Sequence, residues 1–278
     1  MLDTMLIHMP TEQAAPPIAV KHLVKAYSEV TAVNDVSFTI ARGSRTALLG
    51  GNGAGKTTTI SMLLGLVLPT SGSIALFGED ITRHRYRVLH RMNFISPYVN
   101  LPMRLTLRQN LETFANLYGV RDPAARVRDI AGELRLEELL DRPAGTMSAG
   151  QKTRAALAKS LVNAPELLLL DEPTASLDPD TADWVRTKLS EYQAARGATL
   201  LIASHNMVEV ERMADRVIML ESGRIVEDGT PAELLGRYDR ETLEDVFLDI
   251  ARGRRQACEP GEPRGGDALA SAGVADAS

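Results

Sequence analysis

Residues 46–68, TALLGGNGAGKTTTISMLLGLVL, carry the clearest structural signal in this chain of 278 residues. The opening TALLG has the short apolar pattern of a buried strand, and TTTISMLLGLVL is an apolar segment long enough for a helix. The turn between them satisfies the pattern G-x-x-x-x-G-K-[ST], with Gly50, Gly55, Lys56 and Thr57 at its fixed positions. A strand, a glycine-rich turn and a helix in this order predict a loop that binds phosphate groups.

The residue types of this turn have physical roles in phosphate binding. Glycines allow successive backbone N–H groups to turn inward around phosphate oxygens, and the N-terminus of the following helix adds positive potential. Lys56 would reach the β and γ phosphates of a nucleotide, and Thr57 would bind Mg²⁺. A chance match in a glycine-rich loop is disfavoured by the flanking strand and helix. The residues of this segment predicted to bind a nucleotide are Gly50, Asn52, Gly53, Ala54, Gly55, Lys56, Thr57 and Thr58.

A second motif, LLLLDEP at residues 167–173, places two acids at the C-terminal end of an apolar strand. That edge of a parallel sheet is where ligands bind. Asp171 would help to hold Mg²⁺, and Glu172 is placed to polarise an attacking water. Two acids after a strand are, by themselves, more often helix caps or solvated charges. Together with the phosphate loop, they indicate a catalytic site.

Composition and charge exclude several classes of protein. The net charge of −5 leaves no basic footprint for nucleic acid. No stretch approaches the roughly 18 consecutive apolar residues that span a bilayer. The first 17 residues lack the positive start of a signal peptide, so none is expected. The one cysteine, Cys258, cannot form an internal disulfide, which fits a reducing compartment.

Strands that alternate with helices predict an α/β fold, a P-loop NTPase core with a mostly parallel sheet. The β-rich start, IAVKHLVKAY and AVNDVSFTIA, is expected to form an N-terminal antiparallel β region. Charged, leucine-periodic segments at about 83–163, such as ARVRDIAGELRLEELLDR, predict an inserted α-helical subdomain. The last residues, rich in Gly, Pro, Ala and Ser, cannot bury enough apolar surface to fold.

A third motif, TMSAGQKTRAALAKSLV at residues 146–162, predicts a helix capped by Ser148. Alone, it is no more than a capped helix. The order of motifs in this chain is phosphate loop, MSAGQ, LLLLDEP, ASLDP at 175–179 and the histidine of ASHNM. In that order the chain resembles the nucleotide-binding subunits of ABC transporters, whose signature is LSGGQ. The resemblance covers roughly Ile18 to Asp228, and five ordered elements at family spacing make it specific.

The resemblance implies a head-to-tail dimer, in which ATP lies between the phosphate loop of one copy and the signature of the other. It implies that Glu172 activates water and that His205 senses the γ-phosphate, although a lone histidine is more often structural. It implies that Tyr27 stacks on adenine, although a Tyr after a strand also suits simple packing. The family's signature and the loop that links the two sites correspond here to Ser148, Ala149, Gly150, Gln151 and Asp178.

Two places depart from the family pattern. Ala149 stands where the family usually has glycine, and it costs little if its φ is negative, as in the first turn of a helix. The family's glutamine at the end of the strand NFISPY, residues 93–98, is absent, and Tyr98 or Pro97 occupies its place. The catalytic acid and histidine remain, so we expect the chemistry to survive and the coupling to the partner to differ. The hypothesis is that Tyr98 or Asn100 supplies a replacement contact.

The C-terminal ETLEDVFLDIAR, residues 241–252, looks like the LEDVFL segment of subunits that serve ABC-2 type exporters. It also suits an amphipathic helix packed on the core, and both interpretations can hold at once. The predicted units are a flexible lead-in at 1–16, an ABC ATP-binding domain at 17–236, a C-terminal helical segment at 237–252 and a disordered tail at 253–278.

The resulting prediction is an ATPase that uses ATP and Mg²⁺, dimerises on ATP with a second copy or a related ATP-binding subunit, and drives a separate transmembrane permease that moves its cargo outward. It is expected in the cytoplasm at the inner face of the cell membrane, attached through the permease alone and without nucleic acid.

Other classes fit less well. A GTPase would carry the guanine-reading NKxD, a repair ATPase of the coiled-coil type would need a very long heptad insertion, and a translation-type relative would carry two such domains. The alternative kept open is a soluble ATP-binding regulatory protein or a non-transport ABC ATPase. Glu172 argues against it and the missing glutamine argues for it.

Overall fold

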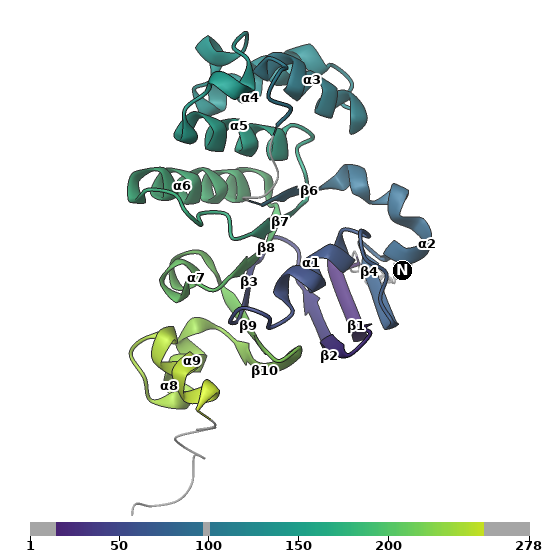
Figure 1. The fold of residues 1–278 in the computed structure, drawn as a ribbon, viewed down its shortest axis with the longest axis vertical. Helices are drawn as coiled ribbons and strands as arrows, with labels where there is room; N and C mark the ends of the chain where they lie inside the picture. Colours follow the sequence, from purple (N-terminus) through teal and green to yellow (C-terminus); the bar gives the residue numbers. More distant parts are fainter. Residues whose placement is uncertain (1–14, 97–100, 253–278) are drawn as a thin grey trace, which may run out of the picture.

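The computed structural model describes residues 15–96 and 101–252, which form two sheets surrounded by helices (Figure 1). The four-stranded sheet has the order β2 (Val30–Ile40), β1 (Ile18–Tyr27), β4 (Ser71–Leu76) and β5 (Glu79–Asp80). The six-stranded sheet has the order β10 (Arg224–Gly229), β9 (Arg216–Glu221), β3 (Arg45–Leu49), β8 (Thr199–Ser204), β7 (Leu167–Asp171) and β6 (Met92–Ile95).

Most of the helices belong to one of two groups. Around the core sheet lie α1 (Lys56–Leu63), α6 (Pro179–Arg196), α7 (Met207–Met213), α8 (Pro231–Tyr238) and α9 (Leu243–Ala251), while α2 (Ile81–His84) packs on β4 and β5 of the four-stranded sheet. A separate group at the top of Figure 1 contains α3 (Leu107–Leu117), α4 (Pro123–Leu134) and α5 (Ala149–Leu161). Short 3₁₀ turns occupy Arg85–Arg87, Leu89–Arg91, Glu137–Leu139 and Ala144–Thr146. None of the helices in the described ranges is long and apolar enough to cross a membrane.

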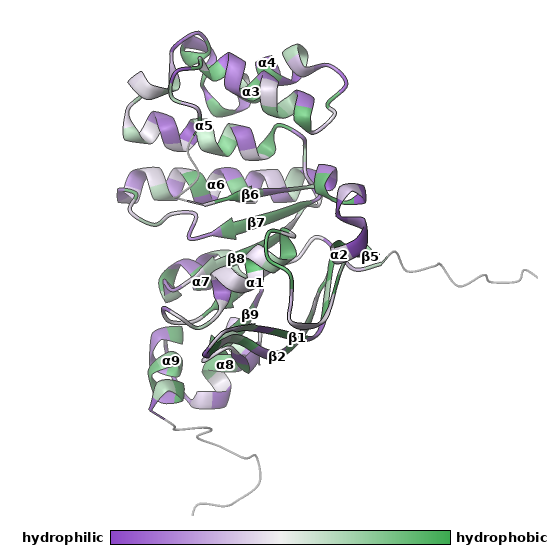
Figure 2. Cartoon of the chain, turned by 45° about the vertical axis from the view of Figure 1, so that its right-hand side comes forward, coloured by the Kyte–Doolittle hydropathy of each residue, from purple (hydrophilic) through white to green (hydrophobic). Residues whose placement is uncertain are grey.

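The core sheet is mostly parallel, as the sequence predicts. Strand β3 pairs in parallel with β8 and β9, β8 pairs in parallel with β7, and β7 with β6, while β10 is an antiparallel edge. All residues of β7 and β8 are buried, because helices cover both faces of a parallel sheet. Figure 2 shows these strands as hydrophobic. Since β3 and β7 flank β8, the loops that follow these three strands meet at one edge.

The other parts of the predicted fold class are confirmed. Strand β1 pairs antiparallel with both β2 and β4, which makes the N-terminal sheet antiparallel. Helices α3, α4 and α5 pack on one another around Leu111, Ile130 and Leu157. The range predicted for the helical insertion also contains β6, which belongs to the core sheet. The domain boundaries themselves stay predictions, and residues 1–14 and 253–278 lie outside the described residues.

The first helix is shorter than its apolar sequence suggests. The segment TTTISMLLGLVL favours a helix up to residue 68, but α1 ends at Leu63. Gly65 follows with a φ of 68°, in the left-handed region that glycine adopts readily. The glycine therefore ends the helix, and the apolar Leu66 and Leu68 beyond it are exposed.

An ion-pair cluster ties the antiparallel sheet to the core strands. Glu166, just before β7, accepts from Arg91 over 2.7 Å between Nε and Oε1 and from Arg42 over 2.8 Å between Nη1 and Oε2. Arg91 precedes β6, and Arg42 follows β2. These contacts, that of Arg91 above all, lower the pKa of Glu166 from 4.5 to about 2.

The E166Q variant should be less stable than the wild type by about 1 kcal/mol near neutral pH. The value is small because the Glu166 side chain is 42% exposed and solvent screens the pairs. A carboxylate whose pKa falls on folding stabilises the folded state above its ordinary pKa and loses that contribution as the pH falls toward the folded value. Urea unfolding of both proteins across this pH range should show the difference shrinking as the pH drops. A difference that stays constant with pH would contradict the assignment.

Candidate functional site

The phosphate loop connects β3 to α1, and two of its glycines are required by the space around them. A Cβ on Gly50 would lie 2.5 Å from the carbonyl oxygen of Leu220. A Cβ on Gly55, which has a φ of 103°, would lie 2.4 Å from the carbonyl oxygen of Ala32. Because both obstacles are backbone atoms of neighbouring strands, the loop takes this path only with glycine at these positions.

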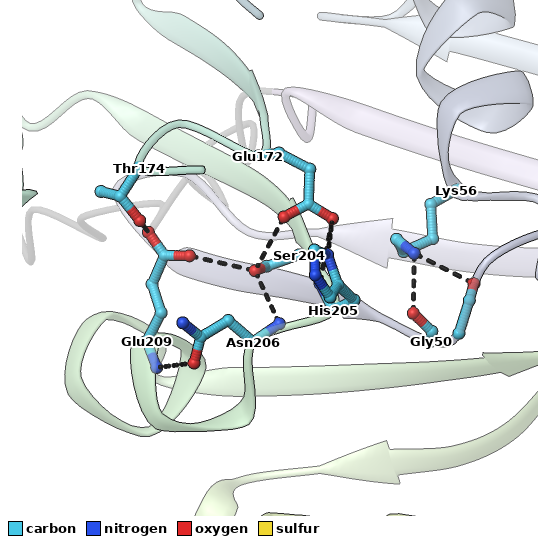
Figure 3. Close-up of polar contacts among 9 residues, drawn as sticks. Gly50, Lys56, Glu172, Thr174, Ser204, His205, Asn206 and Glu209 are labelled. Atoms are coloured by element: carbon cyan, nitrogen blue, oxygen red, sulfur yellow. Dashed lines mark hydrogen bonds and ion pairs between the residues drawn. The ribbon is translucent and has the colours of Figure 1, made fainter. Parts of the chain in front are cut away.

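Lys56 is buried inside the loop that it follows. Its Nζ donates to the carbonyl oxygen of Gly50 over 2.7 Å and to that of Gly51 over 3.1 Å (Figure 3). Burial lowers the pKa of the Lys56 ammonium, and the negative charges of Glu172 and Asp171 oppose this shift. The loop is therefore folded around a positive charge before any ligand enters.

Asp171 and Thr57 face each other across the base of the loop. Asp171 ends β7, is 4% exposed, and lies close enough to Thr57 for that side chain to affect its pKa. Burial raises the pKa of Asp171, the neighbouring Glu172 raises it further, and Thr57 and Lys56 act in the opposite direction. A hydroxyl and a carboxylate side by side are oxygen ligands of the kind that Mg²⁺ prefers.

Glu172 and His205 form a close pair at the ends of β7 and β8. Glu172 Oε1 lies 2.6 Å from His205 Nδ1 and accepts the backbone N–H of His205 over 3.1 Å. Its Oε2 lies 3.4 Å from the hydroxyl oxygen of Ser204. The backbone of Glu172 has a φ of 52°, an uncommon left-handed conformation that directs its side chain toward the histidine.

A cavity of about 800 Å³ joins these groups, which is within the range of ligand sites. Most of the residues predicted from the sequence line it: Asn52, Gly53, Ala54, Gly55, Lys56, Thr57, Thr58, Asp171, Glu172 and His205. Gly50 does not line the cavity, but its carbonyl oxygen accepts a hydrogen bond from Lys56, which does. The other lining residues were not predicted as site residues, although two of them begin the ASLDP motif: Val30, Thr31, Ala32, Gly51, Ala175, Ser176 and Ser222.

Tyr27 is not among the residues that line this cavity. It ends β1, is 46% exposed, and has Lys25 Nζ 4.8 Å from the centre of its ring. The two residues pack on one another at the surface of the four-stranded sheet. Adenine stacking by Tyr27 stays a prediction.

The signature residues lie at the start of α5, away from the cavity lining. Ser148 Oγ accepts the N–H of Gln151, and Gln151 Oε1 accepts the N–H of Ser148, which is a capping box. Ala149 is the first residue of α5 and is not among the non-glycine residues with positive φ, as expected. Asp178 caps α6 by accepting the N–H of Thr181 over 3.0 Å. Their predicted contacts with a partner's nucleotide stay predictions.

The hypothesis that Tyr98 or Asn100 replaces the missing glutamine stays a prediction. Pro97, Tyr98 and Asn100 lie outside the described residues, which stop at Ser96 and resume at Leu101.

Glu209 is a polar residue of the site that sequence reasoning missed. It lies in the first turn of α7, is 3% exposed, and accepts hydrogen bonds from Thr174 and Ser204. The sequence offers a weak signal, because Asn206 followed three residues later by a glutamate suits the start of a helix. That pattern predicts an exposed acid and gives no reason to expect a buried one.

Fold and site together define a phosphate-loop nucleotide-binding protein with an acid–histidine pair beside the loop. Comparison with known protein families gives a more specific assignment. Residues 33–175 match the family model described as ABC transporter. The chain belongs to this family.

The similar proteins agree with that assignment. The Nod factor export ATP-binding protein I of Ralstonia nicotianae is 38% identical over 226 residues, which cover 80% of this chain and 70% of that protein. The protein of the same description from Paraburkholderia xenovorans is 40% identical over 215 residues, covering 76% and 70%.

Solved structures give the same result. One described as the ATP-binding subunit of an ABC transporter has a TM-score of 0.77 at 28% identity and covers 84% of this chain and 99% of that one. The structure of cbiO1 from Clostridium perfringens, part of the ABC transporter complex cbiONQ, has a TM-score of 0.72 at 29% identity, with 86% and 98% covered. The chain is thus an ATP-binding subunit of the ABC transporter family and an ATPase, as its motifs indicate.

The two glycines Gly55 and Gly53 allow a matched test of the loop. Both have positive φ, but a Cβ at Gly53 meets no heavy atom within 4 Å, whereas one at Gly55 meets the Ala32 carbonyl. We expect G53A to cost about 1 kcal/mol of unfolding free energy for backbone strain alone. G55A should cost about 3 kcal/mol, because steric overlap adds to that strain. Urea unfolding of the two variants compares them directly, and equal losses would contradict this account of the loop.

Proposed function

We propose that this chain hydrolyses ATP at a site completed by a second ATP-binding subunit, and that it drives a separate transmembrane permease in the outward direction. The observation that carries the proposal is the pair formed by Glu172 and His205 at the edge of the cavity that the phosphate loop lines. An acid and a nucleotide-binding loop on one cavity provide both the substrate site and the group that activates water.

The phosphate loop provides the binding step. Backbone N–H groups of the loop and the N-terminus of α1 attract the phosphate oxygens. Lys56 exchanges its bonds to the carbonyls of Gly50 and Gly51 for bonds to the β and γ phosphates. The lysine is already desolvated by the protein, so its transfer to phosphate costs little further dehydration.

Thr57 and Asp171 are the residues that would hold Mg²⁺. Their contact and the burial of Asp171 fit this cation, which is usually bound through one or two carboxylates together with substrate phosphates and water. The cation would supply charge neutralisation at the phosphates of the nucleotide. Lys56 would add the protein's own positive charge to the same site.

Glu172 is proposed to accept the proton of the attacking water. Its Oε1 is held by the side chain and the backbone N–H of His205, so the carboxylate cannot rotate freely. Its Oε2 is then directed at the water, which attacks the γ-phosphorus as the bond to the leaving ADP oxygen breaks. The products are ADP and inorganic phosphate.

The second half of the site is proposed to come from a head-to-tail partner, either a second copy or a related subunit. Ser148 and Ala149 are exposed at the start of α5 in the single chain. The N-terminus of a helix attracts anions, so this end suits the γ-phosphate held by the partner. Gly150 and Gln151 extend the same turn, and Asp178 begins the helix next to it.

Export through a permease is supported by the relatives, whose description names export. The helix α9 carries the LEDVFL segment, and its buried Leu243, Val246 and Ile250 pack on α7 and α8. The proposed position is in the cytoplasm at the inner face of the cell membrane, where the permease would hold the subunit. A soluble regulatory ATPase is the alternative, and the missing glutamine is the observation that favours it.

The E172Q variant should lose at least 100-fold in the rate of ATP hydrolysis while its affinity for ATP stays the same. The amide cannot accept a proton from water, but the phosphate loop is untouched. Turnover is measured by phosphate release, binding by titration with a fluorescent ATP analogue, and dimer formation by light scattering. E191Q is the matched control, because Glu191 lies on the exposed face of α6, paired with Lys188. Turnover by E172Q at the wild-type rate would contradict the role of Glu172.

The permease is tested by purifying the tagged full chain from gently solubilised membranes of its host. We expect a multi-span membrane protein in a stoichiometric amount, because the proposed function attaches the subunit to a permease, as the description of its relatives suggests. Mass spectrometry identifies that protein, and the K56A variant serves as the comparison for partners that depend on nucleotide. Recovery from the soluble fraction alone, without such a partner, would favour the regulatory alternative.

A further inference from the structure

A buried carboxyl group lies directly behind the proposed catalytic pair. Glu209 is 3% exposed, and the hydroxyl of Thr174 donates to its Oε1 over 2.5 Å (Figure 3). The hydroxyl of Ser204 donates to its Oε2 over 3.0 Å. Thr174 follows Glu172 by two residues, and Ser204 precedes His205, so Glu209 is bonded to both loops that carry the catalytic pair.

Ser204 connects this carboxyl group to Glu172. Its hydroxyl oxygen lies 3.0 Å from Glu209 Oε2 and 3.4 Å from Glu172 Oε2, and it accepts the backbone N–H of Asn206 over 3.0 Å. A serine hydroxyl has one proton to donate, so it cannot serve both carboxyl groups fully. Ser204 is fully buried, and its proton therefore goes to the nearer acceptor, which is Glu209.

We propose that Glu209 is a positioning residue for ATP hydrolysis, which keeps the proton of Ser204 away from Glu172. With that proton directed at Glu209, Oε2 of Glu172 stays open as an acceptor for the proton of the attacking water. A hydrogen bond from Ser204 to Glu172 would stabilise the charged carboxylate and weaken it as a base. The inference rests on the proposed function, because it assigns a role to Glu172 in turnover.

The variant E209Q keeps the shape of the side chain but replaces one accepting oxygen with an NH₂ group that donates. Its amide oxygen can still accept from Thr174, and its NH₂ group then faces Ser204 and donates to the serine oxygen. The serine proton is displaced from its former acceptor and turns toward Glu172 Oε2. We expect kcat for ATP hydrolysis to fall about tenfold, with KM and the affinity for an ATP analogue unchanged, because no group of the phosphate loop moves.

The double variant E209Q/S204A provides the decisive test. Removal of the serine hydroxyl removes the misplaced proton, so kcat should rise from the E209Q value to that of S204A alone. S204A by itself should keep at least a third of wild-type turnover, because the proton of Ser204 takes no part in the reaction. If the two losses multiply instead, Glu209 acts only through the stability of the fold, and the proposal is overturned. Wild-type turnover by E209Q would overturn it as well.

A control on the same helix separates this role from general damage to α7. Glu211 accepts the backbone N–H of Leu243 over 2.6 Å, and the amide oxygen of E211Q can still accept it. E211Q should match the wild type in turnover and in melting temperature. Melting curves of all variants identify any loss of folded protein, and rates are compared per folded chain. If E209Q does not fold, S204A alone still tests the proposal. Turnover by S204A as low as a tenth of the wild-type rate would overturn it.

A different experimental result would contradict the proposed function itself. A wild-type chain without ATP turnover, or an E172Q variant with full turnover, would overturn the assignment of Glu172 and this inference with it. Normal turnover by the wild type and loss in E172Q, combined with multiplied losses in the double variant, would overturn the role of Glu209 alone.

Discussion

The ammonium group of Lys56, bound by the carbonyls of Gly50 and Gly51, is the interaction on which the rest of the site depends. A buried positive charge is costly unless polar groups surround it, and here the loop's own backbone supplies them. The loop can supply them only because it curls tightly, which the glycines at 50 and 55 permit. The Lys56 ammonium thus fixes the shape of the loop that a nucleotide would occupy. The phosphates would need only to take the place of the two carbonyl oxygens as acceptors of its hydrogen bonds.

The parallel sheet brings the other groups to this cradle. Strands β7 and β8 are buried along their whole length, so their order and register are set by apolar packing. The polar residues begin where the strands end, at Asp171 on one and just after Ser204 on the other. Functional side chains therefore stand on a rigid edge, and their distances to Lys56 depend on the sheet more than on any contact between them.

The sequence predicted those parts of the site whose positions follow from local spacing. The phosphate loop, the acidic pair and His205 each follow an apolar strand, and parallel strands end at a common edge. Glu209 could not be found in this way, because MVEVERM contains two glutamates in similar local surroundings. Glu209 is buried by the strand loops packed against α7, whereas Glu211 binds the start of α9. The strand at NFISPY was predicted from its sequence, and β6 overlaps it at Met92–Ile95, but its pairing with β7 joins residues far apart in the chain and could not be found from local spacing.

The three carboxyl groups of the site differ because their neighbours differ. Asp171 is buried beside Thr57 and Lys56, Glu172 is bonded to His205, and Glu209 is bonded to two hydroxyls. Lys56 alone cannot balance Asp171 and Glu172 together with the phosphates of a nucleotide, and the repulsion is strong where water is excluded. On the proposed function, a divalent cation held by Asp171 and Thr57 would supply the missing positive charge, and Glu172 would then be the carboxylate that acts as a base. On these proposals, Asp171 serves charge balance, Glu172 serves proton transfer, and Glu209 orients the hydroxyl of Ser204 between them.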